Sequence, residues 1–113
     1  PHTGYTLAKM GMSFVTLGLA AEFGAQGVAV NALWPKTVIA TDAIQMIPGV
    51  DARNCRRPQI VADAAHAILI RDAQGFSGNF LIDEDVLHEA GVADFGQYAV
   101  QPGQPLLPDL FLG

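Results

Sequence analysis

Val28-Ala29-Val30-Asn31-Ala32-Leu33-Trp34 predicts a β-strand that ends at Pro35. The stretch is mostly apolar and shows no clean alternation of apolar and polar residues, which is typical of an internal parallel strand covered on both faces. Proline cannot donate a hydrogen bond to a strand ladder, so Pro35 marks the end. The elements on either side of this strand then decide the class of fold.

A long helix precedes the strand. We expect it to run from about Gly4 to Phe23, with Thr3 as N-cap, Gly24 as its stop and Gly27 in the following turn. Small residues recur along one side at helical spacing: Gly4, Ala8, Gly11, Val15 and Gly18. The helix is apolar nearly all round, and one sheet covers only one face. We therefore expect the small-residue seam to meet a partner subunit, giving a homo-oligomer.

A second helix and a second strand follow. Pro58 suits the first turn of a helix that reaches about Asp72, and Phe80-Leu81-Ile82 forms a short strand before a short helix through Glu89. The order helix, strand, helix, strand is typical of consecutive βα units around a parallel sheet. The sequence therefore predicts an α/β fold.

Two segments have weak periodicity. Residues 36–57 form a connection long enough to be a binding loop or lid, with a helical part over 41–47. Residues 92–113 carry several prolines and end in the apolar residues Leu110-Phe111-Leu112. We expect this part to be an irregular tail docked on a surface.

Composition excludes several classes of protein. The 113 residues suit one domain, and 50% hydrophobic with 15% charged residues is not the composition of a disordered chain. The net charge of -5 argues against nucleic acid or an anionic membrane as partner, and no run is apolar enough to span a bilayer. Cys55 is the only cysteine, so we expect a reducing, intracellular environment, with the cytoplasm as default.

Tyr5 and Lys9 lie one turn apart on the same face of the first helix. An ammonium group beside a phenol stabilises negative charge on the phenol oxygen, so a Tyr at this spacing can exchange a proton with a substrate oxygen. The same spacing also occurs in ordinary helices, where the Tyr packs and the Lys is solvated. The spacing alone leaves both interpretations open.

The features in this order resemble the C-terminal half of a short-chain dehydrogenase/reductase. The resemblance rests on five consecutive pieces: Tyr5-x-x-x-Lys9, the strand ending at Trp34-Pro35, the loop after it, the helix after Pro58, and Ser77-Gly78-Asn79-Phe80-Leu81-Ile82-Asp83. It implies the last two strands and flanking helices of a Rossmann-like doubly wound parallel sheet, incomplete as a domain. Residues 1–91 would belong to that domain, with 36–57 as substrate lid and 92–113 as tail.

Within the family, the chain is most similar to the hydroxysteroid dehydrogenase-like protein two group. Three pieces carry this similarity: residues 29–37, residues 78–84, and the tail through Pro102-Gly103. The group also has Lys at the position of Lys36, where most family members have Gly.

The resemblance implies roles for individual residues. Tyr5 would be the proton donor and acceptor at the substrate oxygen, and Lys9 would be its partner and hold the nicotinamide ribose hydroxyls. The main chain after Pro35, at Val38, would bind the nicotinamide carboxamide. Thr41 would contact the cofactor nearby, one position later than the family pattern. The cofactor would be NAD or NADP, and the substrate a small alcohol or ketone.

Trp34 and Lys36 flank Pro35 at the end of the strand, where ligands of parallel sheets bind. Both are therefore candidate substrate contacts. Trp34 could equally be a core residue.

The family's first half is absent from this sequence. It would hold the Gly-rich turn for the pyrophosphate, the residue that selects the dinucleotide, and the catalytic Ser and Asn. Two strands alone leave an open sheet edge. We therefore expect a fragment of a longer protein, or a chain ordered by partners, that is inactive in isolation. A non-catalytic association module is the alternative.

The remaining polar residues give weaker signals. His2, His66, His88 and Cys55 lack metal-ligand spacing, and we expect surface or packed imidazoles. A neighbouring Arg could lower the pKa of the Cys55 thiol, but no His or Asp spacing supports a nucleophile, so we expect an incidental loop thiol. Residues 83–85 are acidic, and we expect a solvated turn or a helix N-terminus rather than a metal site. Arg53, Arg56 and Arg57 would either meet an anionic substrate such as an acyl-CoA or form the solvated base of the lid.

Overall fold

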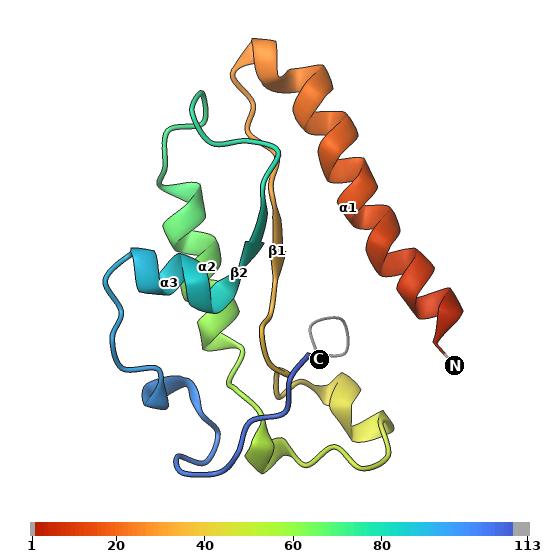
Figure 1. Ribbon diagram of the computed structural model, residues 1–113, viewed down its shortest axis with the longest axis vertical. Helices are drawn as coiled ribbons and strands as arrows, with labels where there is room; N and C mark the ends of the chain where they lie inside the picture. The colour runs from red at the N-terminus through yellow and green to blue at the C-terminus, as the bar shows by residue number, and fades with distance from the viewer. Residues whose placement is uncertain (1, 110–113) are drawn as a thin grey trace. The chain divides into compact units, whose positions relative to one another are not determined.

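The structure is a computed structural model that describes residues 2–109. Its helices and strands are α1 (Thr3–Phe23), β1 (Ala32–Trp34), α2 (Gln59–Leu69), β2 (Phe80–Ile82) and α3 (Asp83–Glu89), shown in Figure 1. β1 and β2 pair as parallel neighbours. The predicted α/β class and element order are confirmed. The chain divides into a first unit, residues 2–34 and 70–81, and a second unit, residues 35–69 and 82–109.

In the first unit, β1 is shorter than the predicted strand. The approach to it is held by polar side chains: the Val30 N–H donates to Ser77 Oγ over 2.9 Å, and Asn31 Oδ1 accepts from the Asn79 N–H over 3.1 Å. These side-chain bonds supplement two main-chain bonds, from the Gly78 N–H to the Val30 carbonyl and from the Ala32 N–H to the Asn79 carbonyl. The sequence pattern of residues 28–31 therefore marks a paired segment that is not a regular strand.

The ends of α1 differ from the prediction. Thr3 is the first helical residue and not the N-cap, which is His2 without a capping side-chain hydrogen bond. Gly24 keeps helical dihedral angles and opens a 3-10 helix, η1 (Gly24–Gln26). The chain turns at Gly27, whose φ of 76° lies in the left-handed region that glycine adopts without strain.

The apolar sides of α1 are exposed in the described chain. Leu7 is 74% exposed and Phe14 is 67% exposed, whereas the buried residues of α1 are Ser13 and Thr16. A Cβ added at Gly4, Gly11 or Gly18 would meet no atom within 4 Å. The small-residue seam therefore has no close neighbour within the described residues.

The core of the second unit lies between α2 and α3, which pack against each other (Figure 1). Ile60 and Ala64 of α2 and Val86 and Leu87 of α3 are buried. Pro58 lies directly before the first helical residue, Gln59, and its carbonyl accepts from the Val61 and Ala62 N–H groups of the first turn. The helix α2 ends at Leu69 rather than at the predicted Asp72.

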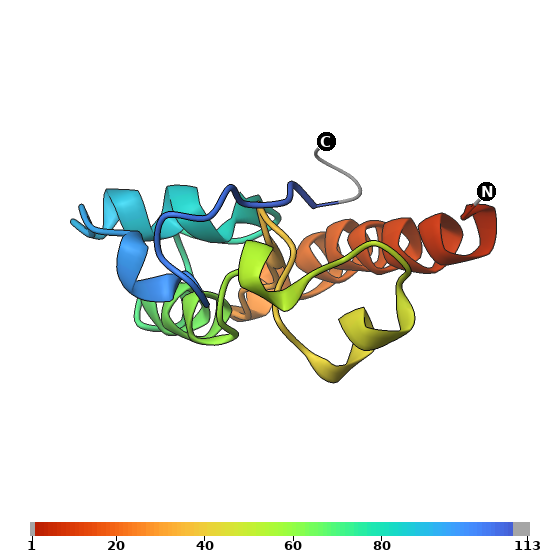
Figure 2. The same cartoon turned by 90° about the horizontal axis from the view of Figure 1, so that it is seen from below.

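Residues 36–57, the predicted lid, and residues 92–109 of the predicted tail belong to the second unit. Residues 36–57 contain two 3-10 helices, η2 (Asp42–Met46) and η3 (Ala52–Asn54), whose course is visible in Figure 2. After η4 (Gly96–Tyr98), the tail runs antiparallel to the start of the lid, with Thr37 opposite Pro108. The predicted apolar end, Leu110-Phe111-Leu112, lies outside the described residues. Over the described part of the chain, no helix has both the length and the apolar character needed to cross a membrane.

Candidate functional site

Tyr5 and Lys9 are neighbours on α1. The Lys9 Nζ lies 5.5 Å from the centroid of the Tyr5 ring, within the range of a cation–π contact. Tyr5 is 49% exposed, so the phenol is accessible to a small molecule. The structure thus brings together the two side chains that the i, i+4 spacing predicts to be adjacent.

The segment Lys36–Val38 is fixed by main-chain hydrogen bonds. The Val38 N–H donates to the Leu107 carbonyl over 2.9 Å, and the Asp109 N–H donates to the Lys36 carbonyl over 3.0 Å. On the other side, the Val38 carbonyl accepts from the Arg56 N–H over 3.0 Å. The tail and the end of the lid therefore hold this segment between them.

A side chain holds the start of the same segment. Asp83 Oδ1 accepts hydrogen bonds from the Lys36 N–H over 2.9 Å and from the Glu84 N–H over 2.7 Å. Asp83 is fully buried, contrary to the prediction of a solvated turn, although it does open helix α3 as the alternative prediction has it. Because β1 and β2 are parallel, the residues that follow each strand meet at one edge of the sheet.

Two basic side chains converge on Glu84. Arg56 Nη1 lies 3.0 Å and Lys36 Nζ 3.3 Å from Glu84 Oε2. Arg56 is buried, so it is not part of the solvated base of the lid. Burial opposes ionisation of Glu84, but Arg56 and Lys36 outweigh it and hold the pKa of Glu84 below its ordinary value.

The pKa of Asp83 is displaced in the opposite direction to the pKa of Glu84. Burial raises the pKa of Asp83 above its ordinary value, although the N–H groups of Lys36 and Glu84 and the charge of Arg56 act against this. Its second oxygen, Oδ2, is buried without a hydrogen-bond partner in the described chain. The site therefore carries two adjacent carboxyl groups whose pKa values are displaced in opposite directions.

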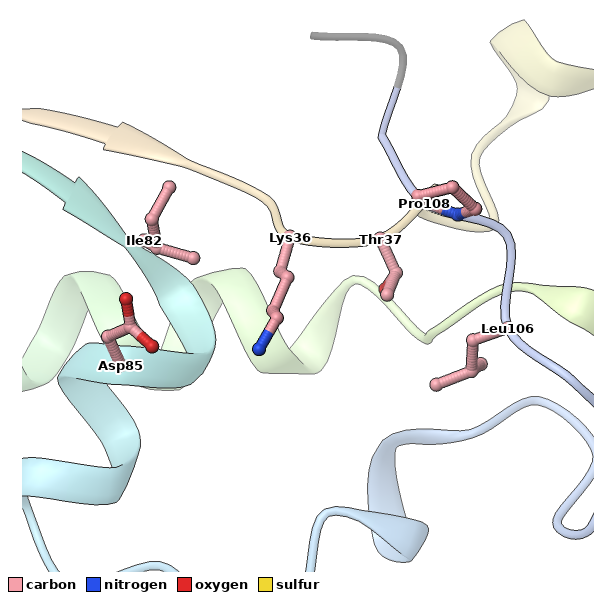
Figure 3. A pocket seen from close by; sticks show the side chains of 6 residues that line it. All are labelled: Lys36, Thr37, Ile82, Asp85, Leu106 and Pro108. Carbon is pink, nitrogen blue, oxygen red and sulfur yellow. The ribbon is translucent and has the colours of Figure 1, made fainter. Parts of the chain in front are cut away.

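A pocket of about 290 Å³ lies beside Lys36 in the second unit (Figure 3). Its lining combines three apolar side chains with one hydroxyl and two charged groups: Ile82, Leu106, Pro108, Thr37, Lys36 and Asp85. The side chains of Lys36, Thr37 and Leu106 project toward this space. Lys36, predicted as a substrate contact, thus lines a cavity and is ion-paired to Glu84.

The residues present fit the nicotinamide end of a dinucleotide in part. The Val38 N–H is already bonded to Leu107, but a carbonyl oxygen can accept two hydrogen bonds, so the Val38 carbonyl can still take an amide N–H in addition to that of Arg56. On α1, the Lys9 ammonium provides donors for ribose hydroxyls. The fit supports an amide acceptor at Val38 rather than an amide donor.

The other predicted residues are placed as follows. Trp34 ends β1 with intermediate exposure, and Pro35 follows it as the first residue of the second unit. Thr41 is exposed just before η2, and its N–H donates to the Ile39 carbonyl. Cys55 is buried, and burial followed by the charge of Asp51 raises the pKa of its thiol, which corrects the expectation of a lowered value. No group of three His, Cys, Asp or Glu residues within 2–109 could hold a metal ion.

The contacts of Asp83 and Glu84 are not predicted from the sequence. The available signal was an acidic pair directly after an apolar strand, at the edge where the preceding strand also ends. A solvated acidic pair is the simpler expectation from the sequence, because the sequence does not show that the Lys36 N–H bonds to Asp83 or that Arg56 pairs with Glu84.

The known proteins to which this chain is similar are longer than the chain itself. No family model matches the chain. It is 54% identical over 112 residues to hydroxysteroid dehydrogenase-like protein 2 of Danio rerio and 50% identical over 113 residues to that of Homo sapiens. These matches cover 98% of the chain but only 26% of each relative.

Two solved structures have the same fold over part of their length. A proposed dehydrogenase from Xanthomonas campestris is 73% identical with a TM-score of 0.94, and the match covers 98% of this chain and 41% of that one. A short-chain dehydrogenase from Mycobacterium thermoresistibile is 41% identical with a TM-score of 0.86, over 96% and 39% of the two chains. The chain is therefore homologous to a part of hydroxysteroid dehydrogenase-like protein 2, and its fold matches part of a short-chain dehydrogenase.

Proposed function

We propose that this chain supplies the acid–base pair and the nicotinamide-side contacts of an NAD(P)-dependent short-chain oxidoreductase that interconverts an alcohol and a ketone. The adjacency of Lys9 and Tyr5 on α1, 5.5 Å from ammonium to ring centroid, carries the proposal. The similarity to short-chain dehydrogenases supports it.

The chain's own residues handle the proton. Tyr5 gives its hydroxyl proton to a ketone oxygen, or receives the proton of an alcohol in the reverse direction. Lys9 stabilises the negative charge that develops on the phenol oxygen and donates hydrogen bonds to the ribose. The bound dinucleotide would supply the hydride chemistry. Its pyrophosphate contacts would come from outside this chain, which has no Gly-rich turn after a strand, so the chain in isolation would be inactive.

The second unit would bind the ring end of the cofactor and the substrate. The Val38 carbonyl would accept the carboxamide N–H, with Thr41 nearby, while Trp34 and Lys36 would contact the substrate. Residues 36–57 would act as the substrate lid of the domain formed by residues 1–91. Met46 is 85% exposed on this lid, which supports contact with an apolar molecule.

The test uses the full protein that contains this chain. Tyr5→Phe should lower kcat about 10²- to 10⁴-fold while the Kd for the nicotinamide dinucleotide stays within about twofold. Lys9→Ala should weaken dinucleotide binding as well as turnover. Tyr98→Phe is the matched control, because it removes the chain's other tyrosine hydroxyl, which is bonded to Asp63. Comparable losses of turnover in Tyr5→Phe and Tyr98→Phe would contradict the acid–base role.

A second candidate is a non-catalytic module that assembles a homo-oligomer through α1. The exposed Leu7 and Phe14 on this helix support it. Titration with NADH and NADPH separates the two, since an association module in the full protein should bind neither.

A further inference from the structure

We propose that Asp83 is a positioning residue, which fixes the main chain of Lys36–Val38 and thereby the contact of Val38 with the cofactor carboxamide. The inference rests on the proposed function, and it assigns a role to a side chain that itself touches no reacting atom.

Asp83 is bonded to the first residue of the segment Lys36–Val38. Pro35 has no N–H, so Lys36 carries the first main-chain donor after β1, and this donor is bonded to Asp83 Oδ1 over 2.9 Å. The same oxygen accepts the Glu84 N–H over 2.7 Å, which ties the segment to the start of α3. One carboxylate oxygen therefore anchors the first main-chain donor after the strand.

Asp83 is the side-chain contribution to a clamp otherwise made by main chain. Further along the segment, Val38 is held by the Leu107 carbonyl and the Arg56 N–H, and the Lys36 carbonyl by the Asp109 N–H. Main-chain bonds survive substitution of the residues that make them, whereas the bond from Asp83 does not. Substitution of Asp83 therefore removes the side-chain part of the clamp, together with the bond to the Glu84 N–H, and leaves the main-chain bonds in place.

Stability alone is a poor reason for a carboxylate here. Asp83 is 0% exposed, and its Oδ2 has no hydrogen-bond partner among the described residues. A buried, half-satisfied carboxylate is costly, and an amide would offer the same acceptor oxygen without the charge, with its NH2 group in the place of the unpartnered Oδ2. What the position requires is a short, rigid acceptor aimed at the Lys36 N–H. An asparagine side chain at this position would meet the same requirement, and this makes the isosteric variant informative.

The experiment compares Asp83→Ala and Asp83→Asn in the full protein. Asp83→Ala should raise the Kd for NADH or NADPH at least tenfold and accelerate amide hydrogen exchange at residues 36–38 at least tenfold. Asp83→Asn keeps the acceptor and should hold both values within about threefold of the unmodified protein. Asp94→Ala is the matched control, because Asp94 is an exposed carboxylate that accepts a single main-chain bond from the Gly96 N–H. It should change neither value.

The outcomes are separable. An unchanged Kd in folded Asp83→Ala, with the unmodified protein binding the dinucleotide, overturns the inference and leaves the proposed function standing. Equal losses in the Ala and Asn variants also overturn it, because the Asn variant retains the bond. If the unmodified protein binds neither dinucleotide, the proposed function and the cofactor role of Asp83 both fail. Should Asp83→Ala not fold, Asp83→Ser replaces it, since its hydroxyl oxygen lies one bond nearer the main chain than Asp83 Oδ1 and so farther from the Lys36 N–H.

Discussion

The Tyr98 hydroxyl donates a hydrogen bond of 2.7 Å to Asp63 Oδ2 and so joins η4 to helix α2. Tyr98 is buried, with 4% of its surface exposed. Tyr98→Phe should lower the free energy of unfolding by about 1.5 kcal/mol, the lower end of the range for a hydrogen bond to a charged group, because water can replace the lost partner at the partly exposed Asp63. Chemical denaturation at pH 7 measures the difference.

The same bond predicts a pH profile. Burial and then Asp63 raise the pKa of Tyr98 to about 12, while the Tyr98 and Gln59 hydrogen bonds lower the pKa of Asp63. The lowered carboxyl pKa gives stability that is lost as the pH falls below about 4, and the raised phenol pKa gives stability that is lost between about 10 and 12. The difference between the unmodified protein and Tyr98→Phe should therefore be largest between these limits. A pH-independent difference would contradict the coupling.

Gly78→Ala should destabilise the first unit. Gly78 has a φ of 75°, its N–H donates to the Val30 carbonyl over 2.8 Å, and an added Cβ would lie 3.6 Å from the Ala20 Cβ. That contact is ordinary, so the cost is the left-handed backbone, about 1–2 kcal/mol. Gly75→Ala is the control, because its Cβ would meet nothing and its φ is not positive. Thermal unfolding of both variants checks the prediction, and equal melting temperatures would contradict it.

Arg56→Met should destabilise the second unit by about 3 kcal/mol. The guanidinium is buried and bonded to Glu84, and its removal takes away the nearer of the two cations that pair with this carboxylate. The remaining Lys36 keeps the cost at the lower end of the range for such pairs. Because the pKa of Glu84 is lowered, the stability it contributes is lost as the pH falls through that pKa, so the deficit of Arg56→Met should shrink in acid.

Arg57, which is exposed and adjacent to Arg56, provides the control for the stability of Arg56→Met. Arg57→Met lies on the surface and should change the free energy of unfolding by less than about 0.5 kcal/mol. If urea unfolding gave the same midpoint for Arg56→Met and Arg57→Met, the Arg56–Glu84 pair would not contribute to stability.

The sequence predicts the order of elements better than their ends. Apolar runs and turn residues locate α1, α2 and β2, because the spacing of apolar residues along the chain reflects the type of element that buries them. The strand before Trp34 is overestimated, since part of its pairing is made by the side chains of Ser77 and Asn31, whose partners lie more than forty positions away in the chain. Such pairings depend on tertiary placement and leave no periodic signal.

In the candidate site, too, some contacts can be predicted from the sequence and others cannot. The adjacency of Tyr5 and Lys9 follows from helix geometry alone and is predictable from spacing. The burial of Asp83 and the convergence of Arg56 and Lys36 on Glu84 depend on three separate segments meeting at the end of the sheet. Local sequence gives the residue types there but not their partners.

Gly11→Leu tests whether the small-residue seam of α1 is an interface. A side chain at Gly11 meets no atom of the described chain within 4 Å, and replacing an interior helical glycine improves helix propensity by up to about 1 kcal/mol. The fold of the chain should therefore be retained. A partner backbone seated on the seam would be displaced, so the full protein should elute from a sizing column at a smaller mass. Ala62→Leu adds bulk at an exposed position of α2 and should leave the mass unchanged. An unchanged mass for Gly11→Leu as well would show that assembly does not use this seam.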